Sequence, residues 1–188
     1  MLLDINNIHT DYIKHILPYI KKGIFIDTSI MKIFLDGFIE LRFSNKKNEN
    51  YDNLISLFEH LKVHNKWGKF WITPHLFTEI CQHFCQDNNR CKRQDFNKIV
   101  ESVIPILKDI NEETIITKDK MLELIDIEKP VIEMGDLSIY IAIDKFLEEY
   151  KKTAIIVKDD GIKRKYENYP NVMVIDYNKT ILDLELRK

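Results

Sequence analysis

The chain has 188 residues, of which 45% are apolar and 31% are charged, and its formal net charge at pH 7 is −2. This composition is that of an ordinary globular protein and excludes wholesale disorder. The small net charge excludes a general positive field of the kind that duplex-DNA-binding domains carry, so any contact with nucleic acid must come from local basic patches. We expect a single domain, residues 1–188, with room for a sizeable core.

The first half of the chain predicts helices around two short buried strands. Apolar residues recur at helical spacing, whereas the strands are short continuous apolar runs. The predicted helices cover 6–22, bent or ended by Pro18, 28–43, interrupted at Gly37, and about 51–61; the strands cover 23–26 and 69–72.

A further helix is predicted to begin after Thr73. Threonine can cap a helix, and proline, here Pro74, is tolerated at the first helical position because its missing N–H is not needed there. A helix over about 92–107, limited by Pro105, follows. The helix-rich region of about 51–107 is therefore expected to form a helical arm on the sheet, within the same domain.

The second half predicts two more strands. They cover 154–158 and 172–175, with helices over about 135–150, around 163–167 and around 181–184. Residues 108–134 stay mostly unassigned, apart from a short helix near 118–125. Strands separated by helices pair in parallel, so the predicted fold is an α/β protein, a three-layer α/β/α sandwich with a central parallel sheet of four to five strands.

Acidic residues stand where predicted strands end and helices begin. Asp27 closes the strand 23–26, and Asp159, with Asp160 next to it, closes the strand that ends at Lys158. The carboxyl ends of parallel strands form the ligand crevice of such a sheet, so these acids can face one pocket. Glu79 and Asp136 need only lie in the opening turns of their helices to join them.

A group of carboxylates in one pocket predicts a divalent-metal site. Mg²⁺ and Mn²⁺ prefer oxygen ligands, and several carboxylates held together repel one another unless a cation neutralises them. Such an ion lowers the pKa of a bound water and offsets charge on a leaving oxygen, which is the chemistry of phosphodiester hydrolysis. The helix dipole explains any one acid at a helix start, but it explains the combination poorly.

Four segments of the chain resemble the successive motifs of PIN-domain nucleases, in the order that the family has them. They are Ile26-Asp27-Thr28-Ser29, Ile72-Thr73-Pro74-His75-Leu76-Phe77-Thr78-Glu79-Ile80, Gly135-Asp136-Leu137-Ser138-Ile139 and Ile156-Val157-Lys158-Asp159-Asp160. The resemblance implies one PIN-like domain with the activity of a metal-dependent endoribonuclease directed at single-stranded RNA.

The resemblance also implies roles for individual residues. Asp27, Glu79, Asp136 and Asp159 would be catalytic and would ligate Mg²⁺ or Mn²⁺. Asp160 remains an alternative fourth ligand, because the last motif lacks the threonine of the family's Thr-x-Asp. The hydroxyl groups of three residues would orient substrate or water: Thr28, Ser29 and Ser138.

The partners implied by the resemblance are RNA and, for a VapC-like toxin, a cognate antitoxin and a second copy of the chain in a homodimer. Lys158, Lys163 and Arg164 lie beside the proposed site and are candidate contacts for RNA phosphates. The first ten residues lack a signal-peptide pattern and no long apolar run occurs, so we expect a cytoplasmic protein without a membrane partner.

Three other hypotheses come from different classes. A non-catalytic PIN-like module would bind RNA or a protein with the fold alone. A phosphatase or phospho-acceptor receiver is disfavoured, because no second acid lies two residues after Asp27 and no early acidic pair is present. A zinc site at Cys81, Cys85 and Cys91 is disfavoured because the C-x-x-C spacing is missing.

Overall fold

The computed structural model describes residues 14–86, 93–112, 117, 119–123, 134–158 and 160–185. Within these ranges the strands form one sheet in the order β3-β2-β1-β4-β5, and every neighbouring pair is parallel. The strands are β1 (Ile24–Ile26), β2 (Phe70–Ile72), β3 (Asn111–Glu112), β4 (Thr153–Val157) and β5 (Val172–Asp176). The prediction of an α/β fold with four to five parallel strands is confirmed.

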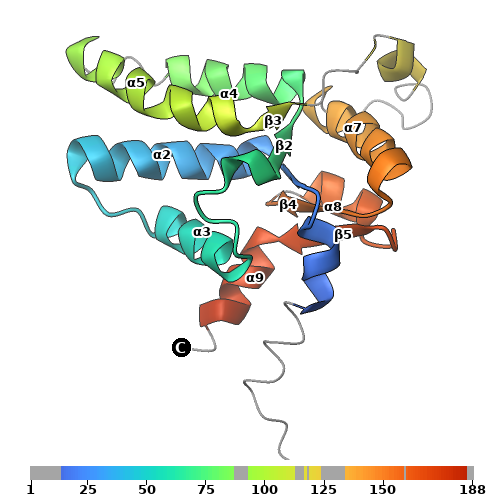
Figure 1. Cartoon of the computed structure of the whole chain (residues 1–188). Coiled ribbons are helices and arrows are strands. Elements are labelled where there is room, and N and C mark those ends of the chain that lie inside the picture. The colour runs from blue at the N-terminus through green and yellow to red at the C-terminus, as the bar shows by residue number, and fades with distance from the viewer. Residues whose placement is uncertain are drawn as a thin grey trace, which may run out of the picture.

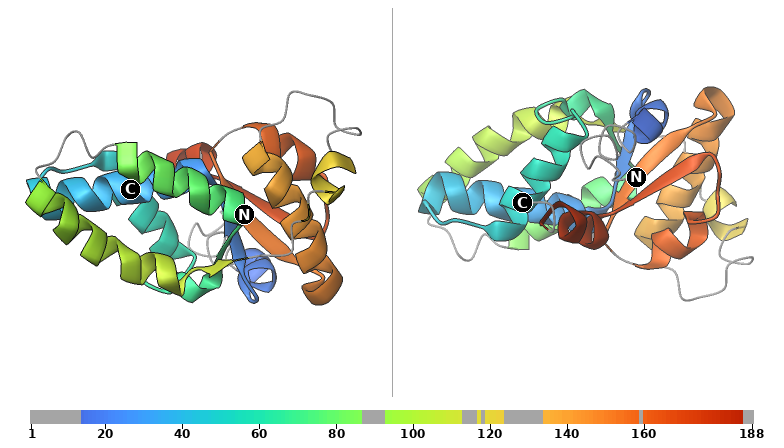
Figure 2. Two further views of the ribbon diagram at one scale, coloured as in Figure 1. Left: turned by 90° about the horizontal axis from the view of Figure 1, so that it is seen from above. Right: turned by 90° about the horizontal axis from the view of Figure 1, so that it is seen from below.

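Helices cover both faces of the sheet, and α7 lies on the opposite side from α2, α4 and α5 (Figures 1 and 2). Right-handed crossovers give this arrangement, because the chain moves from β1 toward β3 and then returns across the sheet to β4 and β5. The helices are 14–20, α2 (Thr28–Ser44), α3 (Glu49–His60), α4 (Pro74–Gln86), α5 (Arg93–Asp109), 119–123, α7 (Met134–Tyr150), α8 (Asp160–Tyr166) and α9 (Tyr177–Glu185), with the 3-10 turn η1 (Trp67–Lys69) before β2.

The central strands are short and completely buried. All three residues of β1 and all five of β4 are buried, which agrees with apolar runs that show no alternation. Strand β3 was not predicted, because its two residues, Asn111 and Glu112, are polar and carry no apolar signal. It is recognised only by its parallel pairing with β2.

Neither the interruption expected at Gly37 nor the limit expected from Pro105 is seen in the structure. Helix α2 continues through Gly37, where an added Cβ would lie 2.1 Å from the Cβ of Tyr51. Gly37 therefore allows α3 to approach α2 closely. Helix α5 continues past Pro105 to Asp109. Proline removes one backbone hydrogen bond, but the buried face around Val103 keeps the helix against the core.

Helices α2, α4 and α5 run beside one another and extend away from the sheet (Figure 1). These three helices form a helical arm that includes α2, which was not expected in it, whereas β2, which lies within the region 51–107, belongs to the sheet. No helix among the described residues is both long and apolar enough to cross a membrane.

Candidate functional site

Strands β1 and β4 are neighbours in the sheet, but the chain continues from them to strands on opposite sides. The connection after β1 leads to β2, and the connection after β4 leads to β5 on the other side. A crevice opens outside the carboxyl ends of the strands at such a switch point. Asp27 directly follows β1, and its backbone N–H donates to the carbonyl oxygen of Ile156 in β4 at 3.2 Å. The sheet topology therefore places Asp27 at the carboxyl end of β1, where a ligand crevice is expected; this end of the sheet is called the acidic crevice below.

Asp27 is a buried acid, with only 5% of its surface exposed. It occupies the N-cap position of α2, and its backbone carbonyl accepts from the N–H groups of Ile30 and Met31, but its side chain does not cap the helix. Instead, Oδ2 accepts a hydrogen bond of 2.5 Å from the Ser29 hydroxyl. Burying a carboxylate is costly unless partners compensate for lost water, so this side chain needs polar or cationic neighbours. Ser29 supplies one of them.

Glu79 is joined to the beginning of α2 although it lies in α4. The Thr28 hydroxyl donates to Glu79 Oε2 at 2.8 Å, and Thr28 itself is buried. Because Thr28 is the residue after Asp27, this bond brings Glu79 to the same end of the sheet. The structure thus brings together two acids that are far apart in the sequence.

The start of α7 lies close to the Glu79 carboxylate. A Cβ added to Gly135 would lie 2.7 Å from Glu79 Oε1, so the absence of a side chain allows this approach. Asp136 follows in the first turn of α7 and is half-buried. Its Oδ2 would lie 3.1 Å from a Cβ on Gly161 of α8, so Asp136 reaches the helix that follows β4. The segments after β1 and β4 and the starts of α4 and α7 therefore converge.

A buried pair of hydroxyls fixes the starts of α4 and α7 relative to each other. Thr73 and Ser138 are 0% exposed, and their hydroxyl oxygens lie 2.6 Å apart. Ser138 also donates to the carbonyl oxygen of Gly135 at 2.6 Å, while Thr73 Oγ1 accepts from the N–H of Leu76, as expected for a helix cap. In the structure Ser138 connects the starts of α4 and α7, while its role in orienting water or substrate stays a prediction.

The candidates for the fourth acid are Asp159 and Asp160. Asp159 lies outside the residues that the structure describes. Asp160 begins α8, its side chain is 67% exposed, and its carboxylate oxygens lie 3.8 Å from Lys163 Nζ and 3.9 Å from Arg164 Nη2. Asp160 therefore interacts with its own helix. Asp159 and Asp160 both remain predictions for the fourth ligand.

The three residues predicted to contact RNA differ in exposure and in their hydrogen bonds within the protein. Lys158 is exposed, and the Arg164 side chain is 79% exposed. Lys163 instead donates to Asp176 Oδ2 at 2.5 Å, and this bond raises the pKa of the Lys163 ammonium. Burial raises the pKa of Asp176, but hydrogen bonds from Lys163 and from the Lys179 backbone outweigh it and hold the pKa below its usual value. Lys163 thus attaches α8 to the end of β5.

The oxygen ligands that the site offers have the chemistry that Mg²⁺ and Mn²⁺ require. Asp27, Glu79 and Asp136 supply carboxylates, and the burial of Asp27 fits a charge that a cation compensates. Over the described ranges, which omit Asp159, no group of three or more acidic, histidine or cysteine side chains is close enough to hold an ion. Of the three cysteines considered for the disfavoured zinc site, Cys91 and the Cys85 side chain also lie outside the described residues.

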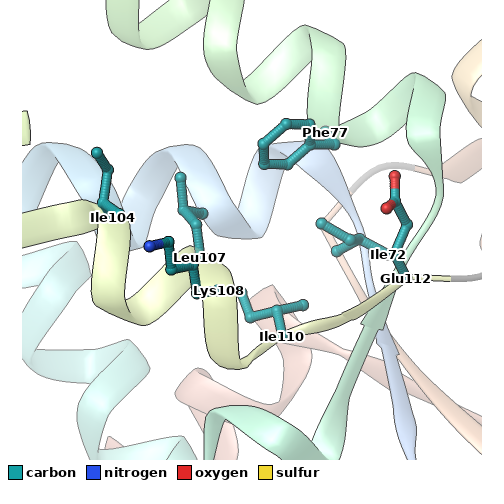
Figure 3. A pocket seen from close by; sticks show the side chains of 7 residues that line it. All are labelled: Ile72, Phe77, Ile104, Leu107, Lys108, Ile110 and Glu112. Atoms are coloured by element: carbon teal, nitrogen blue, oxygen red, sulfur yellow. The ribbon is translucent and has the colours of Figure 1, made fainter.

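A separate apolar pocket of about 370 Å³ lies between α4, the end of α5 and the strands β2 and β3 (Figure 3). Phe77 of α4 points toward it and is 37% exposed. Phe77 and Glu79 are two residues apart on a helix that turns by 100° per residue, so they face different directions. The pocket is thus distinct from the acidic crevice.

Comparison of the chain with protein-family models, with curated proteins and with solved structures finds no match.

Proposed function

We propose that this protein is a Mg²⁺- or Mn²⁺-dependent endoribonuclease of the PIN-domain type. The observation that carries the proposal is the hydrogen bond from Thr28, the neighbour of Asp27, to Glu79, together with the close approach of Gly135, the neighbour of Asp136, to the same Glu79 carboxylate. These contacts connect the segments that carry the three acids near the topological switch point, where α/β sheets bind ligands.

In this proposal Asp27, Glu79 and Asp136 hold the ion, with Asp159 or Asp160 as the fourth ligand. An ion held there would offset the negative charge that develops on the phosphodiester when water attacks it. The chain's own residues keep the ligands in place: Ser29 orients Asp27 and Thr28 orients Glu79. Such supporting hydrogen bonds typically affect metal affinity or activity by 10- to 100-fold.

The first test measures cleavage of a labelled single-stranded RNA by the purified protein, with Mn²⁺ and with excess EDTA. We expect cleavage only with Mn²⁺. The variant Asp136→Asn should lose activity, because an amide cannot supply the charge of a carboxylate. Glu148→Gln is the matched control, since Glu148 is an exposed acid near the other end of α7. Equal cleavage in EDTA, or full activity of Asp136→Asn, would contradict the proposal.

Calorimetric titration with Mn²⁺ separates this proposal from the non-catalytic PIN-like module. The nuclease should bind Mn²⁺ at millimolar concentration or below, and Asp27→Asn should weaken the binding. No binding by the intact protein favours a module that uses the fold alone. Whether the nuclease acts as a VapC-like toxin with an antitoxin is tested by expressing it in cells with and without the product of the neighbouring reading frame.

A further inference from the structure

Lysines surround a second pocket, which none of the predicted site residues lines. The pocket has a volume of about 650 Å³, and its ten lining residues include Lys14, Lys21, Lys62, Lys66 and Lys69. The other five are apolar and include Leu17, which is 40% exposed. No acidic residue is among the described residues that line it, so the described lining consists of five lysines and five apolar residues.

This pocket lies at the amino ends of the strands, whereas the acidic crevice lies at their carboxyl ends. Residues 14–21 lead into β1, and residues 61–69 lead into β2, its parallel neighbour. Because β1 and β2 are parallel, both lysine-bearing segments lie at the same end of the sheet, the amino ends of the strands. Two segments that are about 40 residues apart in sequence create one positive surface on a protein whose net charge is −2.

Two of the lysines are held in position by the backbone. Lys69 Nζ donates to the carbonyl oxygen of Lys21 at 2.8 Å, and Lys66 Nζ donates to the carbonyl oxygen of Lys62 at 2.9 Å. An ammonium group has three donors, so each of the two keeps others for a ligand. Fixing these groups in advance reduces the entropy that a bound anion would otherwise cost.

We infer that this lysine pocket binds the phosphate backbone of single-stranded RNA, at a site separate from the acidic crevice. Lysine binds phosphate as a point charge, and several positive charges without base-reading amides make a contact that is independent of sequence. The volume lies in the range of pockets that hold ligands of several hundred daltons, so the pocket accommodates more than one phosphate. The choice of RNA as the ligand rests on the proposed function.

The test measures binding of labelled poly(U) by fluorescence anisotropy, in EDTA and over a range of salt concentrations. The test variant combines Lys14→Gln, Lys21→Gln and Lys62→Gln, and it spares the two lysines that bond to the backbone. The matched control changes three exposed lysines on other elements and has the same net charge: Lys98→Gln, Lys120→Gln and Lys179→Gln.

Each lysine–phosphate contact contributes about 0.7 to the slope of log K against log salt for a single strand. The slope of log K against log salt should therefore be less steep by about 2 in the test variant, which should bind poly(U) about 100-fold more weakly at 0.1 M salt. The control should keep the slope of the wild type. Equal slopes for the test variant and the wild type, or equal losses in test and control, would overturn the inference. If the triple variant is unstable, the double variant at Lys14 and Lys21 should still lose about 1.4 in slope.

The same measurements distinguish this inference from the proposed nuclease activity. Loss of slope in the test variant with no Mn²⁺-dependent cleavage by the wild type supports the RNA pocket and contradicts the nuclease. Mn²⁺-dependent cleavage by the wild type, together with an unchanged salt slope in the test variant, supports the nuclease and contradicts the RNA pocket. Labelled polyglutamate is the second probe: if it binds as tightly as poly(U) and shows the same loss in the test variant, the pocket recognises an acidic protein segment and the RNA assignment is wrong.

Discussion

Replacing Gly135 with alanine tests whether Glu79 must occupy the position that the structure gives it. The added Cβ would lie 2.7 Å from Glu79 Oε1 and 3.3 Å from Glu79 Cδ. Ordinary van der Waals contact begins at 3.4 Å, so the Glu79 carboxylate must move by about 0.7 Å. That movement also displaces it from the Thr28 hydroxyl, to which it is bonded at 2.8 Å.

The displacement should affect activity much more than stability. Crowding in a packed region costs about 1–3 kcal/mol, with the low end applying here because a carboxylate at the end of a flexible side chain can move. Alanine also gains up to about 1 kcal/mol over glycine in a helix. The unfolding free energy should therefore change by about 1 kcal/mol or less, whereas a misplacement of about 1 Å in a catalytic group can cost 100-fold in rate.

We expect Gly135→Ala to cleave RNA about 10- to 100-fold more slowly than the wild type, with Mn²⁺ binding weakened and the melting temperature changed by a few degrees at most. The assays are single-turnover cleavage, calorimetric Mn²⁺ titration and thermal unfolding. Gly68→Ala is the control, because a Cβ there would meet its nearest neighbour, the Asp109 carbonyl oxygen, at an ordinary 3.5 Å. Unchanged cleavage and Mn²⁺ affinity in Gly135→Ala would refute the reasoning.

Three further substitutions test individual hydrogen bonds. Thr28→Val removes the donor to Glu79; activity and Mn²⁺ affinity should fall about 10- to 100-fold, and undiminished values would exclude a positioning role. Ser138→Ala removes a buried hydroxyl and should lower the unfolding free energy by about 1–3 kcal/mol in denaturant titrations, while the folded variant keeps its rate; a large loss of rate at full occupancy of the folded state would instead support direct orientation of water. Asp176→Asn removes the negative charge that pairs with the Lys163 ammonium. The folded-state pKa of Asp176 is lowered, so the stabilisation it gives is present above its unfolded-state pKa and is lost as pH falls through the folded-state pKa. The variant should therefore be less stable than the wild type near neutral pH, and the difference should shrink below about pH 4; a constant difference down to pH 2 would contradict this assignment.

Local pattern was enough to predict most of the elements. The four apolar strands, the Thr73 cap and the long helices follow from apolar periodicity and from helix-start residues, which act within a few positions of the chain. The errors have a common cause. Gly37 and Pro105 do not end their helices because packing against other elements outweighs local propensity, and β3 exists only because β2 provides a neighbour.

The acids were identifiable from the sequence, but the groups that position them were not. Nothing local indicates that Thr28 donates to Glu79, that Gly135 is needed for the approach of α7, or that Ser138 bonds to Thr73. Each of these contacts joins residues more than 50 positions apart. Their partners are therefore set by the packing of helices and not by spacing in the chain.

The sequence by itself determined the α/β class, the order of the strands in the chain and the acids after β1 and at the starts of α4 and α7, because these depend on short patterns. The tertiary structure alone decided the strand order across the sheet, the switch point between β1 and β4, and the lysine pocket at the amino ends of the strands. Parallel pairing is the physical reason. It places the ends of distant strands side by side, so that Asp27 and the segment with Glu79 meet at the carboxyl ends of the strands, and the lysines of residues 14–21 and 61–69 meet at the amino ends.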